Sequence, residues 1–220
     1  MGGFNKLHMD IRKDGENIMS SALSSFNYFD DIFNEVIEVN YDDRKLILND
    51  VITDDLIEWL CFSIINWNNE DKDIPVDKRR KITIYINSGG GDLIAGRFVL
   101  DIIKYSKTPV ITVALAQCCS MASYILASGH IRYCFPNSIL LYHDGTQGIY
   151  STTNKAKDTM AFYEKLDDDL KKYMLSHSKM TEEFLDSISD REYYMFSSEM
   201  KELGIIDKII GIDCDLDEIL

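Results

Sequence analysis

The chain has 220 residues and 45% of them are hydrophobic, so it can bury one substantial core and is not expected to be disordered. A formal net charge of −14 repels phosphate backbones and anionic lipids, which argues against binding to nucleic acid or to a membrane surface. The sequence has neither a run of about 18 to 20 apolar residues nor the apolar core of a signal peptide, so we expect a cytoplasmic location. Five cysteines form no CxxC pair, and we interpret them as reduced core residues.

The predicted elements begin after a polar stretch, residues 1–40, for which we expect a mobile start followed by a docking helix. Beyond it, β-favouring stretches alternate with stretches whose apolar residues recur every three or four positions, which predicts alternating strands and helices. The predicted strands are 45–48, 82–86, 110–115, 131–134, 138–142, 193–196 and 205–210. The predicted helices are 52–67, 93–105, 121–128, a long one over 153–177, and one from 197, with a further segment at 181–188.

This alternation favours right-handed crossovers and an α/β fold in which a mostly parallel sheet is covered by helices. We predict a single domain over 41–212 and an acidic C-terminal tail over 213–220. In such a fold, polar groups that follow strands gather at the edge where the carboxyl ends of the strands meet. Ser120 and His143 each follow a predicted strand, so we expect them at one edge of the sheet.

Ser120 lies at the junction of a predicted strand and a predicted helix, where a nucleophile would be exposed at a tight bend. The amide of Met121, at the positive end of that helix, would point toward negative charge developing beside the hydroxyl. A serine needs a base that is neutral near pH 7, and histidine is the natural candidate. The chain has four histidines: His8, His130, His143 and His177. Only His143 leaves an apolar strand at the predicted catalytic edge.

A run of three glycines, Gly89 to Gly91, matches neither common phosphate-binding pattern, because the Gly-Lys-Ser/Thr ending and the GxGxxG spacing are absent. Glycine there lets the backbone approach a bound group closely, and the amides of Gly91 and Met121 could both donate to one oxyanion. A catalytic triad also needs a carboxylate to orient the imidazole. Spacing alone leaves four candidates: Asp144, Asp190, Glu192 and Asp207.

Four segments together resemble the proteolytic subunits of the caseinolytic Clp protease (ClpP) family, and the resemblance covers about residues 44–210. The segments are Asn87–Gly91, Gln117–Ala122, Pro136–Ser138 with His143, and Ser198–Asp207. The resemblance implies repeated ββα units of the ClpP/crotonase type, with a protruding handle helix after His143. It also implies Ser120 as the nucleophile, His143 as the general base, and the amides of Gly91 and Met121 as the oxyanion hole.

The third catalytic position is where this sequence departs from the family pattern. Matching 204–207 to the family's closing motif places the family's aspartate at Glu192, whose longer side chain has a different reach. Asp190 is therefore kept as the second choice for the acid. Gly89 also replaces the family's proline, which loosens the turn beside the oxyanion donor.

By this resemblance, the protein is expected to be a serine endopeptidase that cuts unfolded polypeptides through an acyl-enzyme, with no metal or organic cofactor. The resemblance further implies a homo-oligomer of stacked heptameric rings and an AAA+ unfoldase that supplies ATP hydrolysis. Residues 145–152 would pair with extended substrate by strand addition. Two alternatives stay open: a catalytically weak ring subunit, and a crotonase-fold acyl-CoA enzyme, which would not need Ser120 and His143.

Overall fold

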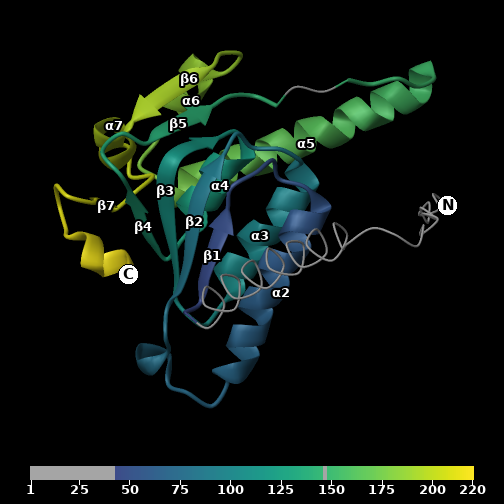
Figure 1. The fold of residues 1–220 in the computed structure, drawn as a ribbon. Coiled ribbons are helices and arrows are strands. Elements are labelled where there is room, and N and C mark those ends of the chain that lie inside the picture. The colour runs from purple at the N-terminus through teal and green to yellow at the C-terminus, as the bar shows by residue number, and fades with distance from the viewer. Residues whose placement is uncertain (1–42, 146–147) are drawn as a thin grey trace, which may run out of the picture. The chain divides into compact units, whose positions relative to one another are not determined.

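The computed structural model describes residues 43–145 and 148–220, and the predicted docking helix within 1–40 lies outside them (Figure 1). Its core is a seven-stranded sheet with the order β1-β2-β3-β4-β7, in which β5 pairs with both β3 and β6. The strands are β1 (Lys45–Leu48), β2 (Ile82–Ser88), β3 (Val110–Cys119), β4 (Ile131–Cys134), β5 (Ile139–Tyr142), β6 (Tyr193–Phe196) and β7 (Lys208–Ile209). All the pairings are parallel except that of β5 with β6, so the predicted α/β fold with a mostly parallel sheet is confirmed.

Helices cover the sheet and connect its strands. They are α2 (Asp54–Glu70), α3 (Leu93–Tyr105), α4 (Met121–Ser128), α5 (Thr153–His177), α6 (Glu182–Ile188) and α7 (Ser197–Glu202), with 3₁₀ turns η1 (Val76–Lys78) and η2 (Leu216–Ile219). Every residue of α4 is buried, because this helix packs against β3, α3 and α5. No helix in the described part of the chain is long and apolar enough to cross a bilayer.

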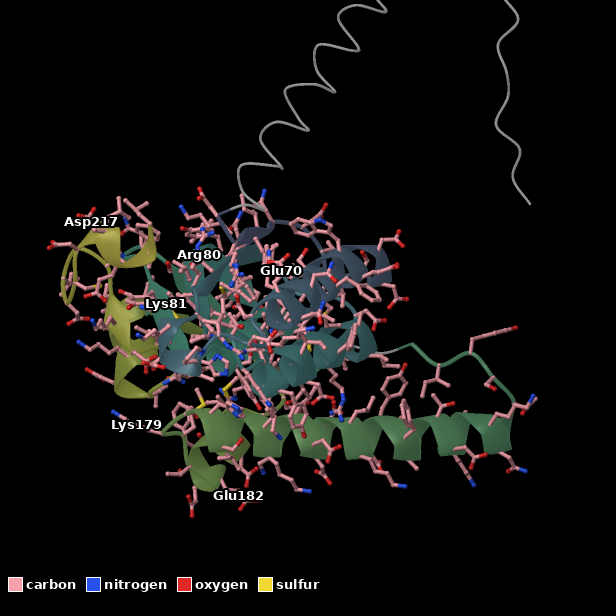
Figure 2. All side chains as sticks on the ribbon, turned by 90° about the horizontal axis from the view of Figure 1, so that it is seen from below. Glu70, Arg80, Lys81, Lys179, Glu182 and Asp217 are labelled. Carbon is pink, nitrogen blue, oxygen red and sulfur yellow. The ribbon has the colours of Figure 1, made fainter. Side chains whose placement is uncertain are left out.

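The predicted handle is α5, whose buried residues all lie in its C-terminal half. Leu166, Leu170 and Met174 recur every four residues and form the apolar stripe of that half. The N-terminal half extends beyond the sheet (Figures 1 and 2). Figure 2 also shows Lys179 and Glu182 beside the C-terminal end of this helix.

The two faces of β3 pack against different parts of the chain, as the alternation of a strand requires. Thr112 faces α4 and donates a hydrogen bond to the Leu126 carbonyl at 2.7 Å. Ile111 and Val113 instead form a core cluster that includes Ile219, which is 3% exposed. The C-terminal residues 213–220, predicted as a tail, therefore include a segment that packs against the sheet.

Four strands differ in length from the prediction, β2 and β5 by one or two residues and β3 and the last strand by four. β3 continues to Cys119 because its first half pairs with β4 and its second half, from Gln117, pairs with β5. The last strand covers only Lys208–Ile209 instead of 205–210, because the amides of Ile205 and Ile206 bond to the Met200 carbonyl and close α7. Backbone groups bonded to a helix end are not available to a sheet.

Candidate active site

The backbone at Ser120 adopts a conformation that non-glycine residues rarely take. Its φ is 53° and its ψ is −128°, at the junction where β3 ends and α4 begins. The Ser120 amide donates to the Leu141 carbonyl at 2.9 Å, and its carbonyl accepts from the amide of Ser123 at 2.9 Å. Backbone strain of this kind costs on the order of 1 to 3 kcal/mol and persists where surrounding structure fixes it, as at active sites. The bend therefore holds a half-buried serine hydroxyl at the edge of the sheet.

The glycine turn after β2 is packed directly against this bend. A Cβ at Gly90, where φ is 99°, would lie 2.6 Å from the Ser120 Cβ and 2.7 Å from the Cys119 carbonyl oxygen. On its other side the turn is bonded to Ile52, whose amide donates to the Gly90 carbonyl at 2.9 Å. The helix predicted from residue 52 therefore begins only at Asp54, because Ile52 bridges to Gly91. Only glycine can occupy position 90 at this separation.

Two backbone amides near Ser120 have no acceptor within the described residues. Met121 is the first residue of α4, so its N–H has no intrahelical partner and lies at the positive end of the helix. The residues on both sides of Gly91 bond to Ile52, through the Gly90 carbonyl and the Asp92 amide. The amide of Gly91 itself makes no hydrogen bond among residues 43–145 and 148–220. An anion formed beside Ser120 would find these donors unoccupied.

His143 lies one residue beyond the end of β5, and it lines the same cavity as Ser120. The cavity has a volume of about 120 Å³, and Tyr124 and Tyr142 also line it. The pairing of β3 with β5 explains this arrangement, because it sets the end of one strand beside the end of the other. The structure thus brings the predicted nucleophile and the predicted base together at one edge of the sheet.

The predicted acid has a hydrogen-bond partner other than the predicted base. The antiparallel pairing of β5 with β6 ends at Tyr142 with Tyr193, and His143 and Glu192 each lie one residue beyond this last pair. Glu192 is exposed, and its Oε2 accepts a hydrogen bond from the Tyr194 hydroxyl at 3.1 Å. Within the described residues, no hydrogen bond joins Ser120 Oγ to His143, or His143 to a carboxylate. The three side chains do not form a hydrogen-bonded line in this conformation.

The other acidic candidates have different partners. The Asp190 amide donates to Asp144 Oδ2 at 2.7 Å, and the backbone at Asp190 has a positive φ of 64°. Asp207 binds Arg132 through Oδ1 at 2.7 Å. Partial burial acts to raise the pKa of Asp207, but the hydrogen bonds from Arg132 outweigh burial and lower it. Asp207 therefore belongs to an ion pair between β4 and the start of β7.

The cysteine beside the nucleophile is unsuited to attack a carbonyl itself. All five cysteines of the chain are unpaired, and Cys119 is 8% exposed. Burial raises the pKa of the Cys119 thiol, which keeps it protonated, and the thiolate is the reactive form of cysteine. The hydroxyl of Ser120 is the nucleophile candidate at this junction.

Sequence reasoning missed the wall of the cavity that α5 and α6 provide. This wall carries Asp167, Asp168 and Lys171 from α5, and Asp186 from α6. The only signal in the sequence was the acidic run 167–169, which is also typical of a solvated helix surface. Its position follows from the packing of α5 against α4, which brings one face of that helix beside Ser120.

The chain matches the family model of the Clp proteases over residues 30–213. The matched range includes all seven strands of the sheet. It also includes the glycine turn, Ser120, His143 and Glu192.

Proposed function

Because the chain belongs to the Clp protease family, we propose that it is a serine endopeptidase that cuts unfolded polypeptides through an acyl-enzyme at Ser120. One observation carries this proposal: Ser120 shares a cavity with His143. Ser120 has a strained backbone, directly precedes the buried helix α4 and packs against the glycine turn at Gly90. The strain, the unoccupied amides and the shared cavity are the features that acyl transfer requires.

In the proposed reaction, Ser120 Oγ attacks the scissile carbonyl carbon while His143 takes the hydroxyl proton. The carbonyl oxygen becomes an oxyanion that accepts hydrogen bonds from the amides of Gly91 and Met121. The C–N bond then breaks, and His143 returns its proton to the leaving amine. A water molecule activated by His143 attacks the resulting ester and releases the second product.

Glu192 is proposed to hold the His143 imidazole and to stabilise its protonated form. For this role its carboxylate must leave the Tyr194 hydroxyl and turn toward His143, and Glu192 is an exposed residue directly before β6 whose side chain can rotate. Asp190 stays the second choice for the acid. Its amide is hydrogen-bonded to the side chain of Asp144, and Asp144 is the residue that follows His143 in the chain.

We extend the proposal to assembly into stacked heptameric rings through α5, and to an AAA+ unfoldase that delivers substrate. Met160 and Phe162 support this assembly, because they lie on the projecting half of α5 with 51% and 47% of their surfaces exposed. Apolar side chains on a projecting helix are suited to burial against a second copy of the chain.

The bond between Glu192 and Tyr194 favours a second candidate function, a catalytically weak ring subunit. In that case the fold and the assembly would be retained while the acid failed to support the imidazole. The match to Clp proteases gives no support to the crotonase-type acyl-CoA alternative.

Cleavage of an unfolded protein and of a short peptide by the full-length chain tests the proposal. Ser120→Ala should lower turnover of both substrates by at least about 10⁴-fold, because the acyl-enzyme cannot form. Ser198→Ala, an exposed serine at the start of α7, is the matched control and should leave turnover unchanged. Equal activity of the Ser120→Ala protein would overturn the proposal, and inactivity of the unmodified protein would favour the weak ring subunit.

A further inference from the structure

The proposed base and the proposed acid lie on two chain segments at the same end of the β5–β6 ladder. The last pair of this antiparallel ladder is Tyr142 with Tyr193 (Figure 1). His143 directly follows Tyr142, and Glu192 directly precedes Tyr193. Beyond the last pair, the ladder no longer fixes the distance between the two segments. A further contact is therefore needed if the imidazole and the carboxylate are to stay within hydrogen-bond reach of each other.

One side chain supplies such a contact. The Asp144 carboxylate accepts a hydrogen bond from the amide of Asp190, with 2.7 Å between Oδ2 and the nitrogen. This bond joins the segment that carries His143 to the segment that carries Glu192. His143 lies between the last ladder pair and Asp144 along one segment, and Glu192 lies between that pair and Asp190 along the other. Both segments are thus held together on each side of the two candidate groups.

The backbone at Asp190 is shaped to meet this carboxylate. From the last ladder pair to the new contact, the chain advances two residues on the β5 side, from Tyr142 to Asp144, and three on the β6 side, from Tyr193 to Asp190. Such a mismatch requires a bend in the longer segment, as at a β-bulge. Asp190 provides the bend with a φ of 64°, a region that aspartate enters more readily than most residues. The bend and the hydrogen bond therefore support each other.

The same bond separates two possible roles of Asp144, whose position next to His143 in the chain also made it a candidate for the acid. The carboxylate is engaged by the amide of the neighbouring segment, and within the described residues no hydrogen bond joins it to His143. A neutral amide oxygen can also accept from a backbone N–H, whereas stabilising an imidazolium requires a negative charge. A positioning role and an acid role of Asp144 are therefore separable by substitution.

We propose, building on the peptidase function above, that Asp144 is a positioning residue that holds the segment of Glu192 against that of His143, so that the carboxylate can reach the imidazole. Asp144 does not touch the reacting atoms and acts through Glu192. Tyr194 and Asp144 then act on different parts of one segment, because Tyr194 binds the carboxylate of Glu192 and Asp144 fixes the backbone two residues before it.

Peptide turnover by variants of the full-length protein tests the inference. Asp144→Ala removes the acceptor and should lower kcat by roughly ten- to thirtyfold, which is less than the loss expected on removal of the acid itself. Asp144→Asn keeps an acceptor oxygen at the same reach and should stay within about threefold of the unmodified protein. Asp77→Ala, which removes an exposed carboxylate from η1, is the matched control and should leave turnover unchanged.

A double-mutant cycle with Glu192→Gln separates positioning from a general effect on the fold. Because Asp144 acts through Glu192, Asp144→Ala should lower turnover by less than about twofold in the Glu192→Gln background. An equal loss in both backgrounds would overturn the positioning role. A loss in Asp144→Asn as large as that in Asp144→Ala would also overturn it, because the negative charge would then be what matters, and so would full activity of Asp144→Ala.

Hydrogen exchange tests the contact without any substrate. The amide of Asp190 should exchange at least about tenfold faster in Asp144→Ala than in the unmodified protein, and Asp144→Asn should restore most of the protection. Equal exchange in all three proteins would overturn the inference, while cleavage of peptide by the unmodified protein would still support the peptidase. If the unmodified protein cuts no peptide and a fluorophosphonate does not label Ser120, the proposed peptidase fails, and the positioning role fails with it.

Discussion

The two sides of the candidate site are built in different ways. On the nucleophile side, Ser120 is held by backbone bonds and by contact with Gly90, and the helix that follows it is buried along its whole length. On the acid side, Glu192 directly precedes β6, which pairs only with β5 among the described strands, and Glu192 is exposed. The comparison teaches that backbone contacts fix the position of the proposed nucleophile, whereas the carboxylate of the proposed acid is fixed, within the described residues, only by its hydrogen bond to Tyr194.

The largest effect is expected on the acid side, from Glu192→Gln. A neutral amide cannot stabilise the imidazolium, so peptide turnover should fall by roughly 10²- to 10⁴-fold without loss of stability. Asp190→Asn is the matched variant two residues away and should change turnover by less than about threefold. The opposite pattern would assign the acid to Asp190.

A large loss of stability is expected from Arg44→Met, at the end of the sheet where β1 and β3 begin. Arg44 binds Asp71 at 2.6 and 2.9 Å, and Asp71 also accepts from the Thr108 hydroxyl at 2.8 Å. The variant leaves a buried carboxylate unpaired, which should lower the free energy of unfolding by about 3 to 5 kcal/mol. Denaturant titration measures this loss, and a change below about 1 kcal/mol would show that the pair is not structural.

The same pair predicts a pH dependence. The hydrogen bond from Arg44 lowers the pKa of Asp71 in the folded state, so the pair stabilises the fold above the ordinary carboxyl pKa, about 4. This contribution should be lost as the pH falls below that value through the lowered pKa. In Asp71→Asn, stability should depend less on pH in this acid range, and an unchanged acid dependence would contradict the assignment.

The elements that were predicted correctly are those whose bounds are set by residues within one segment of the sequence. The bounds of α3, α4, β4 and α5 were predicted correctly, because helical spacing and turn residues such as Pro109 are read within one segment. The length of β3 was not, because its second half is a strand through pairing with β5 and, at Cys118, with Ser88 of β2. Likewise, the ends of the predicted strands placed Ser120 and His143 at one edge of the sheet. The acidic wall of the cavity was not predicted, because it depends on the packing of α5 against α4.

A moderate effect is expected from Gly90→Ala, which breaks the contact that fixes the nucleophile. The added Cβ would lie 2.6 Å from the Ser120 Cβ and 2.7 Å from the Cys119 carbonyl oxygen, so the variant should lose about 2 to 4 kcal/mol of stability together with most peptidase activity. Gly89→Ala is the control, because a Cβ there meets nothing within 4 Å and its φ is not positive. Equal stability of the two variants would show that the close approach is not required.

The smallest effect is expected from Tyr194→Phe, which removes the hydroxyl that is hydrogen-bonded to the Glu192 carboxylate. Loss of the 3.1 Å bond should raise turnover by roughly two- to tenfold, since Glu192 no longer has to break it to reach His143. Tyr193→Phe is the control, because that hydroxyl binds Glu199 at 2.6 Å and not Glu192. Unchanged turnover in Tyr194→Phe would show that the bond does not compete with His143.

The central claim is that the fold presents Ser120 as an activated nucleophile beside His143. Intact-mass spectrometry after treatment with a fluorophosphonate tests it most directly, because the reagent reacts with activated serines without needing a substrate. We predict one adduct per chain, located at Ser120, absent in Ser120→Ala and strongly slowed in His143→Ala. No adduct on the folded full-length protein, or an adduct that persists in Ser120→Ala, would contradict the account.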